Sequence, residues 1–131
     1  MTNSTSPLAS TVDLLIVDDD ADLRELLQFY FNNLGYRTEA AANGREAIKL
    51  CKRSKPRLIL LDVKMPGPGG YEVYQAVREM PDTNNTSIIF LTQYNTRDER
   101  LVGLGLGADD FIGKPFDVQE LRLRVEHRLR K

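Results

Sequence analysis

Short runs of apolar residues alternate along this chain with longer segments in which apolar residues recur every three or four positions. The runs LLIV (Leu14–Val17), LILL (58–61) and SIIFLT (Ser87–Thr92) have the length and composition of strands that are buried on both faces. A weaker strand is predicted over YRTEAA (36–41), and a short fifth strand is predicted over DFI (110–112). The pattern therefore predicts five strands.

Segments with helical spacing lie between these runs. The first begins at Ala21 and ends at Gly35, and it carries apolar residues at helical intervals: Leu23, Leu26, Leu27, Tyr30 and Leu34. Further helices are predicted from Asn43-Gly44 to just before Pro56, over residues 71–80, from about Arg97 onward, and over residues 118–130. The helix from about Arg97 is expected to carry Leu101, Leu104 and Leu106.

Five strands that alternate with five helices predict an α/β fold, a doubly wound (βα)5 domain with a parallel sheet covered on both faces. In such sheets, functional sites form outside the carboxyl ends of the strands. Asp18 and Asp19 follow the first strand, Asp62 ends the third, Thr92 ends the fourth and Lys114 follows the fifth. We therefore expect these side chains to meet at one edge of the sheet.

The composition predicts one domain and sets limits on its partners. The chain has 131 residues, a net charge of -1 and one cysteine, and its first twelve residues are rich in serine and threonine. We expect a disordered leader over residues 1–12 and a folded domain over residues 13–131. The leader does not resemble a signal peptide, and no apolar run is long enough to span a membrane. These features predict a soluble cytoplasmic protein with no membrane or nucleic-acid partner favoured by charge.

The clustered carboxylates require positive charge nearby. Two carboxylates about 4 Å apart repel each other by about 4 kcal/mol at an effective dielectric constant near 20. Lys114 supplies one positive charge, and a divalent cation would supply the remainder. Carboxylates combined with a main-chain carbonyl and water suit Mg²⁺, whereas no His or Cys lies near enough in the pattern to favour zinc.

This combination of groups suits phosphoryl transfer. Asp62 can attack phosphorus as a nucleophile and form an acyl phosphate. Mg²⁺, the hydroxyl group of Thr92 and the ammonium group of Lys114 would then hold the phosphoryl oxygens. The proline- and glycine-rich segment that follows Asp62 would leave its outer side open to a phosphodonor.

The segments LLIVDDD, LILLDVKMPGPGG, FLT and GADDFIGKPF resemble the motifs of response-regulator receiver domains, and the resemblance covers residues 13–130. It implies a flavodoxin-like fold with strand order 2-1-3-4-5. It also implies that Asp62 is the phosphoacceptor. Asp18 and Asp19, together with Asp62 and the main-chain oxygen of Lys64, would bind Mg²⁺.

The resemblance assigns roles to four further residues. Thr92 and Lys114 would contact the phosphoryl group, Phe111 would be an aromatic switch residue that moves with Thr92, and the Lys114-Pro115 bond would be cis. The donor would be a phosphohistidine on a sensor kinase or phosphotransfer protein. Phosphorylation would then change the partner preference of the surface formed by the fourth helix, the fifth strand and the fifth helix. Such a protein is a regulator, not a metabolic enzyme.

A set of charged residues near the C-terminus resembles a dimerisation face. The set resembles that of the winged-helix OmpR/PhoB-like subfamily, whose receivers dimerise through complementary charges, and it consists of Arg100, Asp109, Asp110, Glu120 and Arg124. Exposed ion pairs of this kind contribute only about 0–1 kcal/mol each, although they fix orientation. The same residues also suit an ordinary solvated surface.

The residues leave other functions open. A pseudo-receiver that acts as a scaffold and is never phosphorylated would share the fold. A phosphatase of the haloacid-dehalogenase type would also use an aspartate nucleophile and Mg²⁺, but it requires a second aspartate where this chain has Lys64. Gln93 stands where receiver domains commonly have a small residue, so the lifetime of the phosphorylated state stays open. The sequence also leaves open which kinase, which signal and which output partner belong to this chain.

Overall fold

The computed structural model describes residues 12–93, 97, 101, 105 and 107–130. Its centre is a five-stranded parallel sheet of order β2-β1-β3-β4-β5. The strands are β1 (Leu14–Val17), β2 (Thr38–Ala41), β3 (Leu58–Asp62), β4 (Ser87–Thr92) and β5 (Asp110–Gly113). The predicted fold class and strand order are confirmed.

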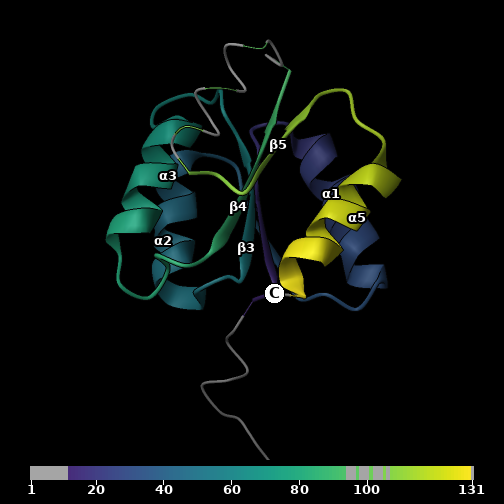
Figure 1. Ribbon diagram of the computed structural model, residues 1–131, viewed down its shortest axis with the longest axis horizontal. Coiled ribbons are helices and arrows are strands. Elements are labelled where there is room, and N and C mark those ends of the chain that lie inside the picture. The colour runs from purple at the N-terminus through teal and green to yellow at the C-terminus, as the bar shows by residue number, and fades with distance from the viewer. Residues whose placement is uncertain (1–11, 94–96, 98–100, 102–104, 106, 131) are drawn as a thin grey trace, which may run out of the picture.

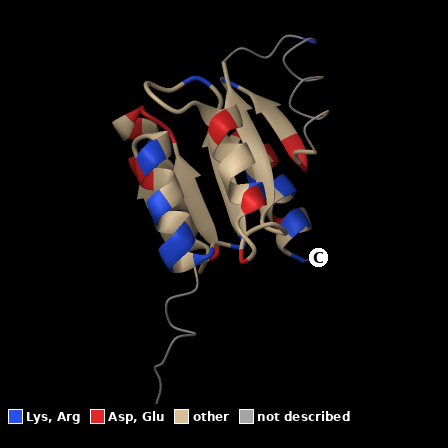
Figure 2. Ribbon diagram, turned by 90° about the vertical axis from the view of Figure 1, so that its left-hand side faces the viewer, with Lys and Arg blue, Asp and Glu red and all other residues tan. Residues whose placement is uncertain are grey.

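Helices cover both faces of this sheet (Figure 1). They are α1 (Ala21–Asn33), α2 (Gly44–Ser54), α3 (Gly70–Glu79) and α5 (Val118–Leu129). The helices α2 and α3 lie side by side on one face, and α1 and α5 cover the other (Figures 1 and 2). None of the helices in the described ranges is both long and apolar enough to cross a lipid bilayer.

The predicted helix from about Arg97 can be followed at three positions only. Arg97, Leu101 and Gly105 have helical backbone, and all three are exposed. The other positions between 94 and 106 lie outside the described residues, and they include Leu104, Leu106 and Arg100 of the predicted dimer face.

The core consists of two apolar layers, one on each face of the sheet. Alternate residues of β1 point to opposite faces, so that Leu15 and Val17 join the layer under α2 and α3, while Leu14 and Ile16 join the layer under α1 and α5. All four residues of β1 and all five of β3 are buried. Burial on both faces explains why these strands appear in the sequence as continuous apolar runs.

Polar residues at the helix ends fix where the helices begin and end. The carboxylate of Asp20 caps α1 by accepting hydrogen bonds from the backbone N–H groups of Asp22 and Leu23. Asn43 caps α2 in the same way through the N–H of Glu46. Each cap satisfies amide groups that have no partner inside the helix, so both helices begin where the sequence predicts.

The structure changes two details of the sequence interpretation. Leu26, which belongs to the apolar series predicted for the first helix, is 57% exposed, whereas Phe31 is fully buried. The buried stripe of α1 therefore runs through Leu27 and Phe31, which lie four residues apart. Val12 was assigned to the leader but is buried, and its carbonyl accepts a hydrogen bond from the N–H of Arg57. The other leader residues lie outside the described part of the chain.

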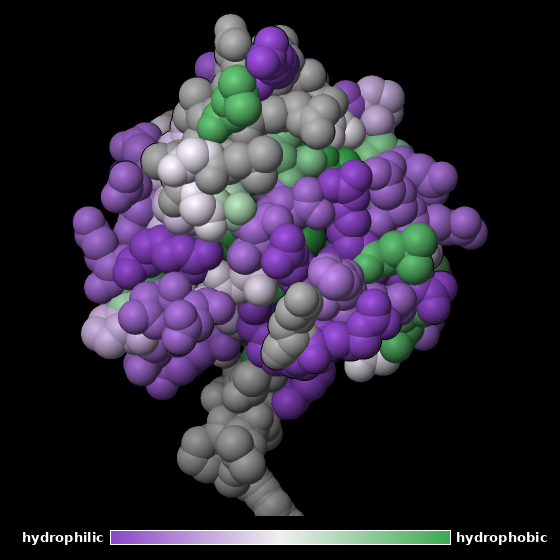
Figure 3. All heavy atoms as spheres, viewed as in Figure 1, coloured by the Kyte–Doolittle hydropathy of each residue, from purple (hydrophilic) through white to green (hydrophobic). Residues whose placement is uncertain are grey.

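Large apolar side chains reach the surface at four described positions: Leu26, Phe29, Leu101 and Leu123. The face of the molecule seen in Figure 3 is mainly hydrophilic, with separate hydrophobic areas. Scattered exposed apolar residues of this kind are normal for a protein surface and need no special explanation.

Candidate functional site

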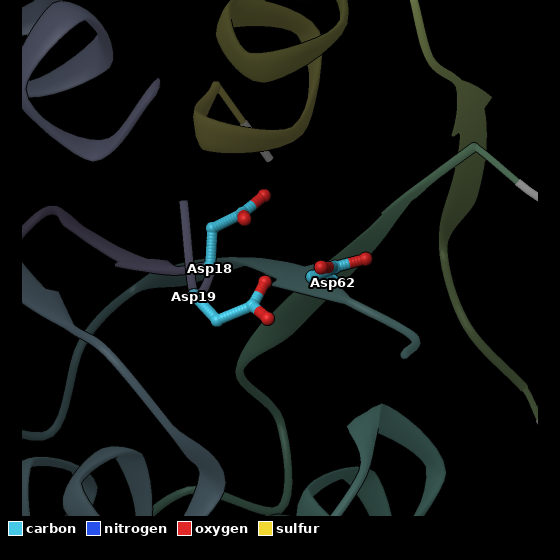
Figure 4. A group of neighbouring side chains, drawn as sticks. All are labelled: Asp18, Asp19 and Asp62. Carbon is cyan, nitrogen blue, oxygen red and sulfur yellow. The ribbon is translucent and has the colours of Figure 1, made fainter. Parts of the chain in front are cut away.

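The register of the sheet brings the acidic residues together. Val17, the last residue of β1, pairs with Leu61 of β3. The next residue along each chain segment is an aspartate, so Asp18 and Asp62 lie beside each other at the carboxyl edge of the sheet. Asp19 follows Asp18 directly in the chain. One carboxylate oxygen from each of the three lies within 4.8 Å of the others, and Figure 4 shows the three carboxylates around a common space.

Lys114 reaches into this cluster from the end of β5. Its Nζ atom lies 2.6 Å from Oδ2 of Asp18 and 3.6 Å from Oδ2 of Asp62. The ammonium group therefore makes a direct charged hydrogen bond with Asp18 and a longer ion pair with Asp62. The predicted meeting of these groups at one edge of the sheet is what the geometry shows.

Asp18 is held rigidly in this position. Its side chain is buried, and its Oδ1 atom accepts a hydrogen bond of 2.9 Å from the backbone N–H of Asp20. The guanidinium group of Arg24 in α1 donates a hydrogen bond of 2.7 Å to the Asp18 carbonyl oxygen. Both oxygens of this carboxylate thus have donors, one of them cationic, which offsets part of the cost of burying its charge.

Asp62 is in a less favourable electrostatic environment. Burial, followed by the nearby negative charge of Asp18, raises the pKa of the Asp62 carboxyl group from 3.8 to about 6, although Lys114 acts in the opposite direction. The backbone N–H of Lys64 also favours the ionised form by donating to this carboxylate. A carboxylate whose charge is poorly compensated is suited to binding a cation.

A surface hollow of about 420 Å³ opens onto the cluster. Its lining includes all three aspartates and residues of the three strand-end loops, Lys64, Gln93 and Lys114. Gln93, which stands where receiver domains commonly have a small residue, is exposed and lies in the lining of this hollow. The site is therefore open to solvent on the side where a donor would approach.

Thr92 and Phe111 lie on the last two strands, Thr92 at the end of β4 and Phe111 within β5. Thr92 is fully buried at the end of β4, and its carbonyl accepts a hydrogen bond of 2.7 Å from the N–H of Lys114. Phe111 is 4% exposed, and its ring lies 6.0 Å from that of Phe90, centroid to centroid. The Lys114-Pro115 peptide bond is cis, as the resemblance implied.

The three carboxylates fit a divalent cation of the Mg²⁺ type. Two of them are buried and fixed by the strands, the third is exposed, and the described residues place no histidine or cysteine in the group. Mg²⁺ binds to proteins through a few carboxylates and keeps several waters, which a site open on one side permits. The donor set therefore agrees with the predicted cation.

The described residues of the predicted dimer face form ion pairs within the chain. Arg124 donates to Asp110 at 2.7 Å and to Glu120 at 2.5 Å. Asp109 accepts a hydrogen bond from the N–H of Ile88 and has Arg128 beside it. Their use in dimerisation stays a prediction.

Sequence reasoning missed two contributors to the site. The sequence interpretation assigns no role to Arg24, and nothing in the pattern indicates that its side chain reaches back to the end of β1. Gly70 was not singled out either. A β-carbon at Gly70 would lie 2.4 Å from the carbonyl oxygen of Asp62, so only glycine lets α3 begin this close to the site. The paired glycines after Asp62 were the available signal.

Comparisons with known proteins agree with this geometry. The family model described as "Response regulator receiver domain" matches residues 14–126. The chain is 41% identical over 118 residues to the "Probable transcriptional regulator ycf27" of Porphyridium aerugineum. The aligned residues make up 90% of this chain and 48% of that protein. The chain therefore spans about half the length of the curated regulators of this name that it matches. An "Uncharacterized 14.6 kDa protein" of Leptolyngbya boryana is 39% identical over 110 residues, 84% of each chain.

Solved structures show the same arrangement. A putative response regulator from Chloroflexus aurantiacus superimposes with a TM-score of 0.85 at 36% identity, covering 92% of this chain and 99% of the other. The chemotaxis protein CheY4 of Vibrio cholerae gives a TM-score of 0.83 at 30% identity, covering 89% and 98%.

Proposed function

Because this chain belongs to the receiver domains of response regulators, we propose that Asp62 accepts a phosphoryl group from a phosphohistidine with the help of Mg²⁺. Receiver domains of this family act in phosphorylation-dependent signalling. The observation that supports the proposal is the position of Asp62: buried and poorly compensated in charge, within 4.8 Å of two further carboxylates and 3.6 Å from an ammonium group.

In the proposed reaction, a carboxylate oxygen of Asp62 attacks the phosphorus atom of the donor. An O–P bond forms while the N–P bond of the phosphohistidine breaks, and the imidazole nitrogen leaves with the electron pair of that bond. Asp18, Asp19, Asp62 and the main-chain oxygen of Lys64 would hold Mg²⁺, which supplies positive charge for the phosphoryl oxygens. Lys114 would shift from Asp18 toward the new phosphate.

The other residues would pass the change to the surface. Thr92 would turn its hydroxyl group toward the phosphoryl oxygens, and Phe111 would follow on the neighbouring strand. The hydrogen bond from the N–H of Lys114 to the carbonyl oxygen of Thr92 joins the ends of β4 and β5. A displacement of one strand end would therefore displace the other. Phosphorylation shifts such an equilibrium only as far as it stabilises one state more than the other.

The role proposed for the chain is regulatory, not metabolic. A cytoplasmic histidine kinase or phosphotransfer protein would be the donor, and the surface formed by the predicted fourth helix, β5 and α5 would carry the response.

We also propose, from the resemblance to the OmpR/PhoB-like subfamily, that two phosphorylated copies dimerise through this surface. Arg124 would then exchange one of its partners within the chain for an acid of the second copy, and Arg124→Glu should lower dimerisation in sedimentation velocity experiments.

Intact-mass measurement tests the phosphoacceptor directly. After incubation with Mg²⁺ and acetyl phosphate, the wild-type protein should gain the mass of one phosphoryl group. Asp62→Asn should gain none, and EDTA should prevent the gain in the wild type. If the wild type gains no mass with any small phosphodonor, the chain acts instead as a scaffold that is never phosphorylated.

A further inference from the structure

The exposed face of α2 carries a row of cations. Arg45, Lys49, Lys52 and Arg53 are all exposed, and Lys55 follows at the end of the helix. Ten residues of helix cover about 15 Å, so these side chains line one side of the molecule. Figure 2 shows the Lys and Arg segments following one another along this helix.

These cations are only weakly compensated within the chain. Arg45, Lys49 and Lys52 form no ion pair with any described residue, while Arg53 and Lys55 have distant partners, Glu39 at 3.8 Å and Asp82 at 3.5 Å. Like charges three or four positions apart destabilise a helix. The chain as a whole has a net charge of -1, so this row of cations is a local feature that the overall charge does not indicate.

A hollow lies beside the first turns of this helix. It has a volume of about 500 Å³ and is lined by Asn43, Arg45, Glu46 and Lys49 on one side and by residues 66–68 on the other. Pro66 and Pro68 give it apolar surface. The carboxylate of Glu46 accepts a hydrogen bond of 2.8 Å from the N–H of Ala42 and forms no ion pair with a cation among the described residues.

The hollow has a firm base. A β-carbon at Gly44 would lie 2.4 Å from the carbonyl oxygen of Pro68 and 2.9 Å from Val73, so the start of α2 lies directly against the loop that follows Asp62. The backbone of α2 and the proline walls therefore hold a fixed spacing. When a partner binds, this backbone has little conformational freedom to lose, and the ordering cost falls on the exposed side chains.

We propose that the exposed face of α2 and this hollow form a docking surface for an acidic segment of a partner protein. Carboxylates of the segment would pair with Arg45, Lys49 and Lys52, and an apolar side chain would enter the hollow between Pro66 and Pro68. A nucleic acid fits less well, because α2 offers no aromatic ring for stacking. The surface lies outside the phosphoacceptor site, so its use does not depend on the proposed reaction.

Fluorescence anisotropy with the full chain tests the docking surface. The probe is a short fluorescein-labelled peptide of Glu-Glu-Leu repeats, compared with a Glu-Glu-Ser peptide, a Lys-Lys-Leu peptide and a short DNA strand. We expect the Glu-Glu-Leu peptide to bind most tightly, and to bind more weakly at high salt because the charges are exposed. Lys49→Glu/Lys52→Glu should weaken its binding by at least about tenfold.

The matched control is Arg97→Glu/Arg130→Glu, which changes the net charge by the same amount at two exposed positions elsewhere. This control should keep the affinity of the wild type, and circular dichroism should show that both double variants fold. Asp62→Asn should also bind normally, whatever the outcome of the phosphorylation experiment. The proposal is overturned if the peptide fails to bind, if both double variants lose equal affinity, or if the DNA strand binds more tightly through Lys49 and Lys52.

Discussion

Replacing Asp62 with asparagine should make the metal-free protein more stable at neutral pH, although Asp62 is central to the proposed function. The carboxylate is buried beside Asp18, and these two causes raise its pKa from 3.8 to about 6. Asparagine has nearly the same size but carries no charge, so the substitution removes the repulsion without leaving a cavity. Lys114 keeps its closer partner, Asp18, at 2.6 Å.

The size and sign of the effect follow from the pKa. Because the folded state holds the proton of Asp62 more tightly than the unfolded chain does, protonation favours folding. This contribution is fully present below pH 3.8 and is lost as the pH rises through about 6. A shift of about two pKa units corresponds to about 3 kcal/mol. At neutral pH, Asp62→Asn should raise the free energy of unfolding by up to that amount, which corresponds to about 10 °C in the melting temperature for a domain of this size.

Thermal and urea denaturation in EDTA, at about pH 7.5 and about pH 4.5, measures this difference. The variant should be more stable than the wild type at the higher pH. The difference in stability should narrow at the lower pH, where Asp62 is mostly protonated in the folded state and only partly protonated in the unfolded chain. Glu79→Gln, at an exposed position on α3, serves as the control and should change little. A variant that is no more stable than the wild type, or a gap that does not depend on pH, would refute the reasoning.

Three further predictions concern the structure around the site. Gly70→Ala should cost about 1–3 kcal/mol of stability, because its β-carbon would overlap the backbone of Asp62. Gly105→Ala, where nothing lies within 4 Å, should cost nothing in the same urea titration. Asp20→Ala should lower the stability by about 1 kcal/mol through loss of the α1 cap, whereas Asp20→Asn, which can still cap, should not; equal losses would contradict this. Burial raises the pKa of the Cys51 thiol to about 12, so iodoacetamide at mildly alkaline pH should leave the folded protein unlabelled by mass spectrometry, and rapid labelling would contradict the burial.

Much of the fold is readable from the sequence because local signals and burial agree along the chain. The strand over Ser87–Thr92 is found where the apolar run predicts it, since the four apolar residues between these two positions are all buried. The start of α1 is equally clear, because Asp20 caps it. The strand at residues 36–41 was less well defined: β2 covers only Thr38–Ala41, and three of its four residues are only half-buried.

The sequence by itself also determined which residues gather at the carboxyl edge, because parallel strands bring their ends to the same side. It did not determine how those residues pair. Only the tertiary structure decided that Lys114 lies closer to Asp18 than to Asp62, since that choice depends on distances between strands far apart in the chain. For the same reason, the raised pKa of Asp62 and the tight contact at Gly70 could not be predicted. Burial and close approach are properties of the packed molecule, and a one-dimensional pattern records neither.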